Sequence, residues 1–247
     1  MRVLLPLPLL LLLGCGPCED GASCAVDDGV FFAYEPAGWD GQTPLPALIF
    51  AHGWGGSPEG YAAKSSVRDP FSDAGVLLIL PEGAGGGWDV MEGRQGRDEV
   101  AFIESVLDRA AEDWPVDTDR VTVGGFSLGA SLAYKVGCEV GAARFAAVAP
   151  MSGGYWSPMP TECAGGPVPL RHVHGLADDT WPYDGGRSFG DGFTQTGAEQ
   201  NVEMWRDHVG CGDAIESLPP DVETCTRWTE CGVDVQLCTH EKGHTRV

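Results

Sequence analysis

Val121-Thr-Val-Gly-Gly-Phe-Ser-Leu-Gly-Ala-Ser-Leu-Ala133 is the stretch of sequence that decides the fold. Three β-favouring residues run into two glycines, and a helix-forming run begins at Leu128. Ser127 lies between this strand and this helix. A serine on so sharp a turn is held in strained backbone geometry with its hydroxyl above the sheet, and flanking glycines let strand and helix cross closely. The pattern predicts a nucleophile elbow, although a glycine-rich turn gives the same letters in a chain with 36 glycines.

Short apolar runs on both sides of this stretch predict an α/β fold. The runs 47–51 and 76–80 are continuous and apolar, which is typical of strands buried on both faces. From Asp98 the apolar residues follow a helical period until Trp114. Strands that alternate with helices and short loops indicate a mostly parallel sheet covered on both faces, in one domain over residues 28–247. Further strands are expected at 30–34, 145–149 and 168–173, helices at 128–138 and 195–209, and a hairpin of 224–229 against 233–238.

The N-terminus has the pattern of an export signal. One arginine precedes the apolar run 3–13, which is too short to span a bilayer as a helix. The run ends in Leu12-Leu-Gly-Cys15, which resembles a bacterial lipobox, where the cysteine is lipidated. We therefore expect a lipoprotein-type signal peptide at 1–14, lipidation of Cys15, a tether at 15–27, and anchoring to the bacterial cell envelope. The alternative is an ordinary signal peptide cleaved nearby, which gives a secreted protein.

Cysteine usage agrees with export. The chain has nine cysteines, and lipidation of Cys15 leaves an even number for disulfides. Cys18 and Cys24 are close enough in sequence to close a local loop. Folding the C-terminal hairpin near Cys231 places Cys225 opposite Cys238, as a cross-strand pair. Zinc is the competing interpretation of the C-terminal cysteines, but no Cys-x-x-Cys pair occurs there, so we expect no metal.

The charge of the chain excludes two classes of partner. The formal net charge is −21 at pH 7, and the acidic residues are scattered without a long run. Such a chain repels nucleic acid and anionic lipid. We therefore expect no nucleic-acid partner and a membrane contact only through the lipid anchor, while the oligomeric state stays open.

Acyl transfer by serine needs a nucleophile, a base, an acid that orients the base, and donors for the oxyanion. On an elbow of this kind the acid and then the histidine follow the serine along the chain. Asp178 and His244 follow Ser127 in that order, each just after a predicted strand. Asp179 competes with Asp178, and either carboxylate also fits the role of capping the following turn. His244, in a loop beside a glycine, is the best candidate base.

The other histidines fit the base role less well. His172 and His174 alternate on a predicted buried strand, His208 lies on a predicted helix, and His240 lies at the exit of the last hairpin.

His52 precedes the serine in sequence and opens His52-Gly-Trp-Gly-Gly56 at the end of a predicted central strand. Glycines there let backbone N–H groups turn towards the nucleophile, so we assign the oxyanion hole to the N–H groups of Trp54 and Leu128. A plain glycine-rich turn is the alternative.

Several motifs together resemble one known family. They are His52-Gly-Trp-Gly-Gly, Asp98-Glu-Val-Ala-Phe-Ile103, Pro115-Val-Asp-Thr-Asp-Arg-Val121, Gly125-Phe-Ser-Leu-Gly129, His174-Gly-Leu-Ala-Asp-Asp-Thr-Trp-Pro-Tyr-Asp-Gly-Gly186 and Gly243-His244. In this order they look like the polyhydroxybutyrate depolymerase and feruloyl esterase group of secreted α/β-hydrolases, over nearly everything after about residue 28. Ala130 stands where members of the group usually carry a glycine.

The resemblance implies an α/β-hydrolase fold with Ser127 as nucleophile, Asp178 as acid and His244 as base. It also implies the disulfides Cys138–Cys163 and Cys211–Cys231. The expected activity is therefore that of an exported serine esterase that works through an acyl-enzyme and needs no cofactor. Hydroxyalkanoate, feruloyl and acetyl esters all remain open as substrates.

Aromatic residues near the motifs are candidates for a substrate pocket, and each also fits core packing: Trp88, Trp181 and Tyr183. Three residues follow His244, so we expect little chain to hold the base in place. This favours, as an alternative, a surface binding protein on a hydrolase scaffold with weak or lost catalysis. Serine peptidase activity is a third interpretation.

Overall fold

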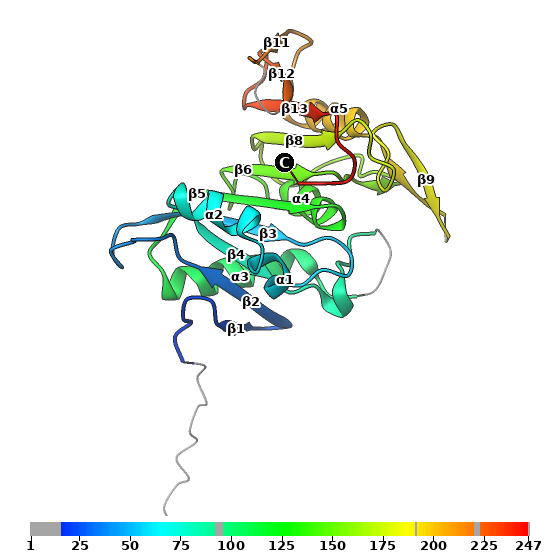
Figure 1. Ribbon diagram of the computed structural model, residues 1–247. Coiled ribbons are helices and arrows are strands. Elements are labelled where there is room, and N and C mark those ends of the chain that lie inside the picture. The colour runs from blue at the N-terminus through cyan, green and yellow to red at the C-terminus, as the bar shows by residue number, and fades with distance from the viewer. Residues whose placement is uncertain (1–15, 92–95, 191, 220–222, 247) are drawn as a thin grey trace, which may run out of the picture.

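The computed structural model describes residues 16–91, 96–190, 192–219 and 223–246 (Figure 1). The predicted signal peptide and Cys15 lie outside the described residues. A ten-stranded sheet runs through the molecule in the order β1-β2-β4-β3-β5-β6-β8-β13-β12-β11. The strands are β1 Ser23–Val26, β2 Gly29–Tyr34, β3 Leu45–Ala51, β4 Leu77–Pro81, β5 Val116–Phe126, β6 Ala147–Met151, β8 Leu170–Gly175, β11 Ile215–Ser217, β12 Thr224–Trp228 and β13 Val235–His240.

The centre of the sheet is parallel, as the sequence predicts. The pairs β4–β3, β3–β5, β5–β6, β6–β8 and β8–β13 are parallel, and the strands at both edges are antiparallel. The middle strands are continuous apolar runs because both of their faces are covered by helices. Along β3, Ala47 and Ile49 pack on one side of the sheet, whereas Leu48 and Phe50 pack on the other.

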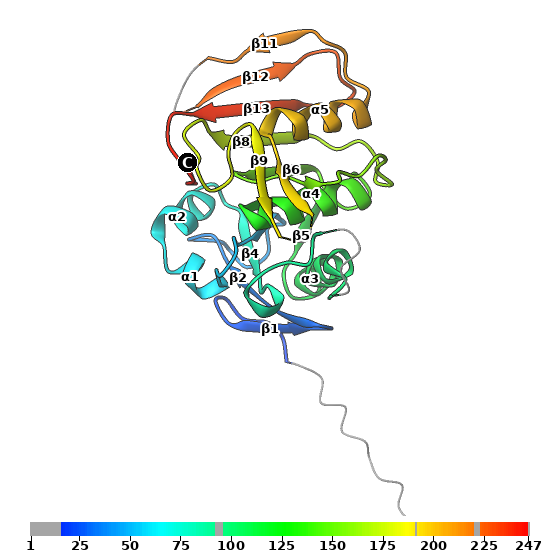
Figure 2. The same cartoon turned by 90° about the vertical axis from the view of Figure 1, so that its right-hand side faces the viewer.

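In the described part of the chain, five α-helices cover the two faces of the sheet (Figure 2). The larger core lies against α3, α4 and α5, and the smaller core lies against α1 and α2. The helix α3 begins after Asp98, whose carboxylate accepts a hydrogen bond from the N–H of Ala101, and it buries an apolar stripe. The helices are α1 Pro58–Ala62, α2 Ser65–Asp73, α3 Glu99–Asp113, α4 Leu128–Glu139 and α5 Ala198–Val209, with a 3₁₀ turn η1 at Ala84–Gly86.

The segment 15–27, predicted to be a tether, also contains a strand of the main sheet. Its residues Ser23–Val26 form β1, which pairs antiparallel with β2, and the Cys24 side chain is buried. The domain therefore begins earlier than residue 28. The strand was not predicted because four residues at a sheet edge are too few to show a clear pattern of polar and apolar positions.

A small antiparallel sheet projects from the main body beside the carboxyl ends of the parallel strands. It consists of β7 Trp156–Ser157, β9 Gly185–Phe189 and β10 Phe193–Thr196, and β9 and β10 form an arm (Figure 1). Because its residues do not alternate regularly between polar and apolar positions, the sequence did not predict these strands.

The C-terminal hairpin has the expected register. Cys225 on β12 lies opposite Cys238 on β13, and the two are joined by a disulfide. The structure also contains the pairs Cys18–Cys24, Cys138–Cys163 and Cys211–Cys231. In the part of the chain that is described, no helix is both long and apolar enough to cross a membrane.

Parallel strands bring several loops to one edge of the sheet. Their carboxyl ends all meet at this edge, which is where sites form in folds of this type. The segments that follow β3, β5, β6, β8 and β13 begin at His52, Ser127, Ser152, Leu176 and Glu241, respectively.

Candidate active site

Ser127 occupies a strained turn between β5 and α4. Its φ is +57°, in the region that side chains other than glycine rarely adopt. A Cβ at Gly125 would lie 2.2 Å from the carbonyl oxygen of Gly129, and a Cβ at Gly129 would lie 2.1 Å from that of Ala51. Both glycines are therefore required where strand and helix cross. Within the described residues nothing hydrogen-bonds the Ser127 hydroxyl, which is partly exposed.

Asp178 and His244 form a hydrogen-bonded pair next to this turn. The Nδ1 atom of His244 lies 2.7 Å from Oδ2 of Asp178, whose side chain is fully buried. The other carboxylate oxygen of Asp178 accepts hydrogen bonds from the N–H groups of Thr180 and Trp181. The capping role and the contact with His244 are thus filled by the same residue, whereas Asp179 is exposed. Asp178, and not Asp179, is therefore the carboxylate that contacts His244.

The electrostatics of Asp178 favour its ionised form. Burial by itself would raise the pKa of the carboxyl group, but the hydrogen bonds from His244 and from the N–H of Trp181 outweigh it and hold the pKa below 3.8. An ionised Asp178 accepts from Nδ1–H of His244, which leaves Nε2 as the nitrogen that can take a proton.

The segment that carries His244 contacts Phe126 and Ser152. The ring of His244 lies 4.6 Å from that of Phe126, the residue before Ser127. The hydroxyl of Ser152 donates to the carbonyl oxygen of Thr245 over 3.2 Å. The guanidinium of Arg246 lies over the ring of Phe126. The expectation that little chain holds the base is therefore not met by the described residues.

Ser152 is a site residue that the sequence analysis missed. It is fully buried, follows β6 directly, and has a φ of +47°. Positive φ at a residue other than glycine costs free energy, which is typical of a position that the surrounding structure fixes for a purpose. Here the strained conformation accompanies a hydroxyl bonded to the segment after the histidine. The only sequence signal was the place of Ser152 at the end of a predicted strand.

All six histidines are described, and His244 alone lies within hydrogen-bond distance of Asp178. His174 is buried on β8 with Nε2 3.7 Å from Oδ2 of Asp178. His240 ends β13 and accepts a hydrogen bond from the N–H of Lys242. His208 lies on α5 against Trp205.

Among the described residues, backbone N–H groups without a hydrogen-bond partner lie around Ser127. The N–H groups of Gly53, Gly55, Gly56 and Ser127 are bonded to the Tyr61 hydroxyl and to the carbonyl oxygens of Gly86, Gly53 and Met151, respectively. Among the described residues, the N–H groups of Trp54 and Leu128 have no such partner. Unpaired backbone donors beside a serine are what an oxyanion hole requires. Glycine at position 53 allows the two loops to approach each other closely, because an added Cβ there would lie only 3.2 Å from Cβ of Ser127.

His52 has a structural role in the loop that carries Trp54. The N–H of Gly83 donates to its Nε2, so Nδ1 carries the proton and donates to the carbonyl oxygen of Gly53. Burial lowers the pKa of His52, which keeps the ring neutral. Trp88 packs against this ring and donates its indole N–H to the carbonyl oxygen of His52.

A buried ion pair supports the same region from α3. Arg97 pairs with Glu99 over 2.6 Å, and both side chains are almost fully buried. The second carboxylate oxygen of Glu99 accepts from the N–H of Asp89, next to Trp88. Removal of either partner would leave a buried charge unpaired, which is costly.

The aromatic residues proposed for a pocket lie mostly in the core. Trp181 is 1% exposed and donates its indole N–H to the carbonyl oxygen of Thr196, and Trp88 is 6% exposed. Neither ring is exposed enough to line a substrate pocket, so the prediction of a pocket role for Trp88 and Trp181 is corrected to core packing. Tyr183 lines a separate groove of about 600 Å³ between α5 and the β12–β13 hairpin. Trp54, in the loop next to Ser127, is 76% exposed.

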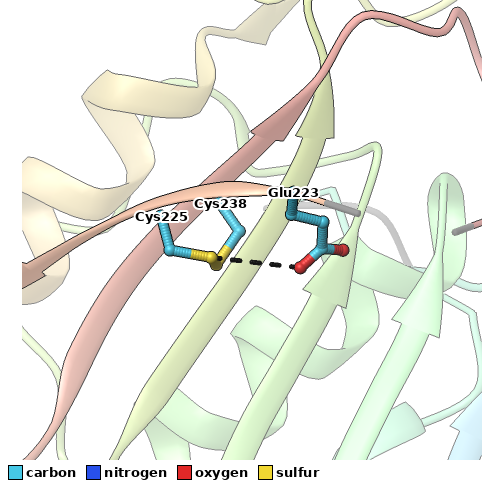
Figure 3. A group of neighbouring side chains, drawn as sticks. All are labelled: Glu223, Cys225 and Cys238. Atoms are coloured by element: carbon cyan, nitrogen blue, oxygen red, sulfur yellow. Dashed lines mark hydrogen bonds between the residues drawn. A yellow bond between two sulfur atoms is a disulfide. The ribbon is translucent and has the colours of Figure 1, made fainter. Parts of the chain in front are cut away.

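Glu223, Cys225 and Cys238 lie close enough together to resemble a metal site (Figure 3). The two sulfur atoms are bonded to each other, and the Glu223 carboxylate lies 4.0 Å from Sγ of Cys225. Disulfide sulfur is not the thiolate that binds zinc, so this group does not fit a metal ion.

No family model matches the chain. The probable feruloyl esterase C of Aspergillus terreus is 24% identical over 216 residues, which cover 85% of this chain and 73% of that protein. The feruloyl esterase C of Emericella nidulans is 26% identical over the same shares of the two chains. Among solved structures, the acetyl xylan esterase from Aspergillus awamori superposes with a TM-score of 0.61 at 15% identity, over 88% of this chain and 89% of that chain.

The fold is that of an α/β-hydrolase in a single domain. The chain is similar in sequence to feruloyl esterases over most of its length.

Proposed function

We propose that this protein is an exported serine esterase that hydrolyses carboxylic esters through an acyl-enzyme. The relatives support a carboxylic ester hydrolase, since those reported above are feruloyl esterases. The observation that carries the mechanism is the 2.7 Å contact between His244 and Asp178 beside the strained turn of Ser127. A strained turn that presents the serine hydroxyl, and a buried carboxylate that orients an imidazole as general base, are features of a serine nucleophile.

In this mechanism the Ser127 hydroxyl attacks the ester carbonyl and His244 accepts its proton at Nε2. Asp178 holds the ring in the right tautomer and stabilises the imidazolium. The N–H groups of Trp54 and Leu128 donate to the tetrahedral oxyanion. Collapse of the intermediate breaks the ester C–O bond, and the imidazolium protonates the departing alcohol. Water then attacks the acyl-enzyme with His244 as base and releases the acid and Ser127.

The substrate proposed is an ester of an aromatic acid of the feruloyl type. The exposed Trp54 indole next to the oxyanion donors supports this choice, because an aromatic acyl group can stack on it. Acetyl esters are the second candidate, since a bifunctional acetylxylan esterase/xylanase of Neocallimastix patriciarum is 30% identical over 153 residues, which are 21% of that protein. Turnover of feruloyl, acetyl and hydroxyalkanoate esters side by side separates these classes.

Export and lipid anchoring are part of the proposal. Four disulfides support an oxidising compartment. The apolar leader and Cys15 support a lipidated N-terminus. Mass spectrometry of the mature protein should find a diacylglyceryl group on Cys15; an unmodified N-terminus at another residue would contradict the anchor while leaving export intact.

A fluorophosphonate probe tests the catalytic proposal without knowledge of the substrate. Covalent labelling requires a working base and oxyanion hole, so we expect a single adduct on Ser127 and none after Ser127→Ala. An unlabelled wild-type protein would favour the alternative of a binding protein that has lost catalysis.

A further inference from the structure

A chain of buried hydrogen bonds lies behind the Asp178 carboxylate. The Tyr134 hydroxyl lies 2.6 Å from Nδ1 of His172, and Nε2 of His172 lies 3.0 Å from Nδ1 of His174. Nε2 of His174 then lies 2.8 Å from the carbonyl oxygen of Trp181. All four side chains are at most 1% exposed. The mechanism above uses none of them.

The last acceptor in the chain decides the direction of every bond. The Trp181 carbonyl oxygen can only accept, so Nε2 of His174 carries a hydrogen. In a neutral His174 the other nitrogen, Nδ1, must accept from Nε2–H of His172. Nδ1 of His172 then accepts from the Tyr134 hydroxyl. With both rings neutral, this is the arrangement that satisfies every nitrogen.

The surroundings keep both rings neutral. Burial lowers the pKa of His172 and of His174. For His174, burial outweighs the hydrogen bond to the Trp181 carbonyl and the Asp178 carboxylate, which both raise the pKa, and His244 and His240 from the C-terminal segment lower the pKa further.

The remaining titratable neighbours are tyrosines. The ring of Tyr183 lies edge-on to His174, and Tyr134 on α4 faces His172.

The chain joins the nucleophile helix to the turn of the acid. Tyr134 lies on α4, whose first residue follows Ser127 directly. At the other end, Trp181 accepts from His174 with its carbonyl oxygen and donates its N–H to Oδ1 of Asp178 over 2.8 Å. Nε2 of His174 also lies 3.7 Å from Oδ2 of Asp178. The position of Asp178 relative to α4 is therefore set through rigid, buried rings.

We propose that Tyr134, His172 and His174 are positioning residues that hold Asp178, and through it His244, in place relative to Ser127. This role rests on the proposed function. A fully satisfied polar network is stiff, and one that loses a member leaves a buried polar atom unpaired, so the acid turn loses its fixed position.

Tyr134→Phe tests the role with a matched control, Tyr155→Phe. Both tyrosines are buried, their rings are in contact, and each hydroxyl makes a hydrogen bond, but the Tyr155 hydroxyl donates to the carbonyl oxygen of Tyr134, outside the chain. We expect Tyr134→Phe to lower kcat by about tenfold with an unchanged KM, because a misplaced acid slows the chemical step and not binding. Tyr155→Phe should leave kcat within about twofold of wild type.

Nitrogen-15 spectra of the imidazoles give a readout that a merely structural role would not move. We expect His172 and His174 both to be neutral with the hydrogen on Nε2 at pH 7, and the Nδ1 signal of His172 to shift in Tyr134→Phe because this nitrogen loses its hydrogen-bond donor while the tautomer, fixed by His174, stays the same. A charged ring, or a hydrogen on Nδ1 of His174, would overturn the assignment.

The two kinds of failure are distinguishable. Equal kcat values for Tyr134→Phe and Tyr155→Phe, in an enzyme whose turnover requires Ser127, would overturn the role of the chain alone. Undiminished turnover by Ser127→Ala would overturn the proposed function and, with it, the role of the chain.

Discussion

The guanidinium of Arg246 lies over the ring of Tyr61, 4.4 Å from its centroid, and this contact joins the segment after His244 to helix α1. The Tyr61 hydroxyl accepts the N–H of Gly53 over 3.1 Å, one residue before Trp54. The side chain of Tyr61 on α1 thus contacts both the loop proposed to donate to the oxyanion and the segment that carries the proposed base, His244.

Replacement of Arg246 by alanine should loosen the base. A cation over an aromatic ring contributes about 1 kcal/mol or more, and misplacement of a catalytic group by a fraction of an ångström slows the reaction steeply. We expect Arg246→Ala to lower kcat by about tenfold with little change in KM. Lys64→Ala is the control, because Lys64 also lies over Tyr61, at 5.6 Å, but does not belong to the base segment. Equal losses in the two variants would contradict a role specific to Arg246.

The Trp54 indole should decide preference for the acyl group. It is 76% exposed, and one side rests on Gly87, where an added Cβ would lie 2.7 Å from the ring. Trp54→Ala should raise KM for a feruloyl ester by about tenfold and leave the kinetics of an acetyl ester nearly unchanged. Phe189→Ala removes another exposed aromatic, on the β9 arm, and serves as control. The same rise in KM for both esters would show that the variant damages the loop rather than a stacking surface.

Acid should destabilise the folded protein in two stages. Burial lowers the pKa values of His52, His172 and His174 below 6.5, so the unfolded chain takes up protons that the folded chain does not as the pH falls below that value. The pKa of Asp178 is held below 3.8 in the folded protein. Its contribution to the free energy of unfolding is therefore present above pH 3.8 and is lost as the pH falls through the lower pKa of the folded state. Urea unfolding should give a plateau in the free energy of unfolding above about pH 7 and a decline below it; a value that is flat or rises on acidification would contradict these shifts.

Loss of the Cys225–Cys238 disulfide should affect catalysis more than loss of Cys18–Cys24. The first pair joins β12 to β13, the strand that leads to His244, whereas the second lies at the opposite edge of the sheet. Replacing Cys225 and Cys238 by serine should cost up to about 3 kcal/mol of stability and lower kcat several-fold. Replacing Cys18 and Cys24 should lower stability without changing kcat in the protein that remains folded. The reverse order of the kcat effects would show that the hairpin does not position the base.

Much of the site could be predicted because its motifs are local. Ser127 and its glycines form a turn that needs no distant residue to be recognised, and Asp178 and His244 each follow a strand with a clear apolar pattern. The pairing of Cys225 with Cys238 followed from hairpin geometry alone.

The supports of the site could not be predicted, since they depend on contacts between distant parts of the chain. Ser152 and Thr245 are 93 positions apart, and Tyr134 and His172 are 38 apart. The sequence around Ser152 does not indicate whether its hydroxyl donates a hydrogen bond to another loop or faces solvent. The burial of Trp181 could not be predicted either, because the local sequence of a loop does not show whether a tryptophan ring faces a pocket or the core.

Steady-state hydrolysis of a feruloyl ester by Ser127→Ala tests the central claim most directly. If Ser127 is the nucleophile, kcat/KM should fall by about 10⁴-fold or more while the thermal stability stays at or above that of wild type, because alanine removes the hydroxyl and little else. Turnover at the wild-type rate would contradict the serine mechanism, and with it the roles assigned to Asp178 and His244.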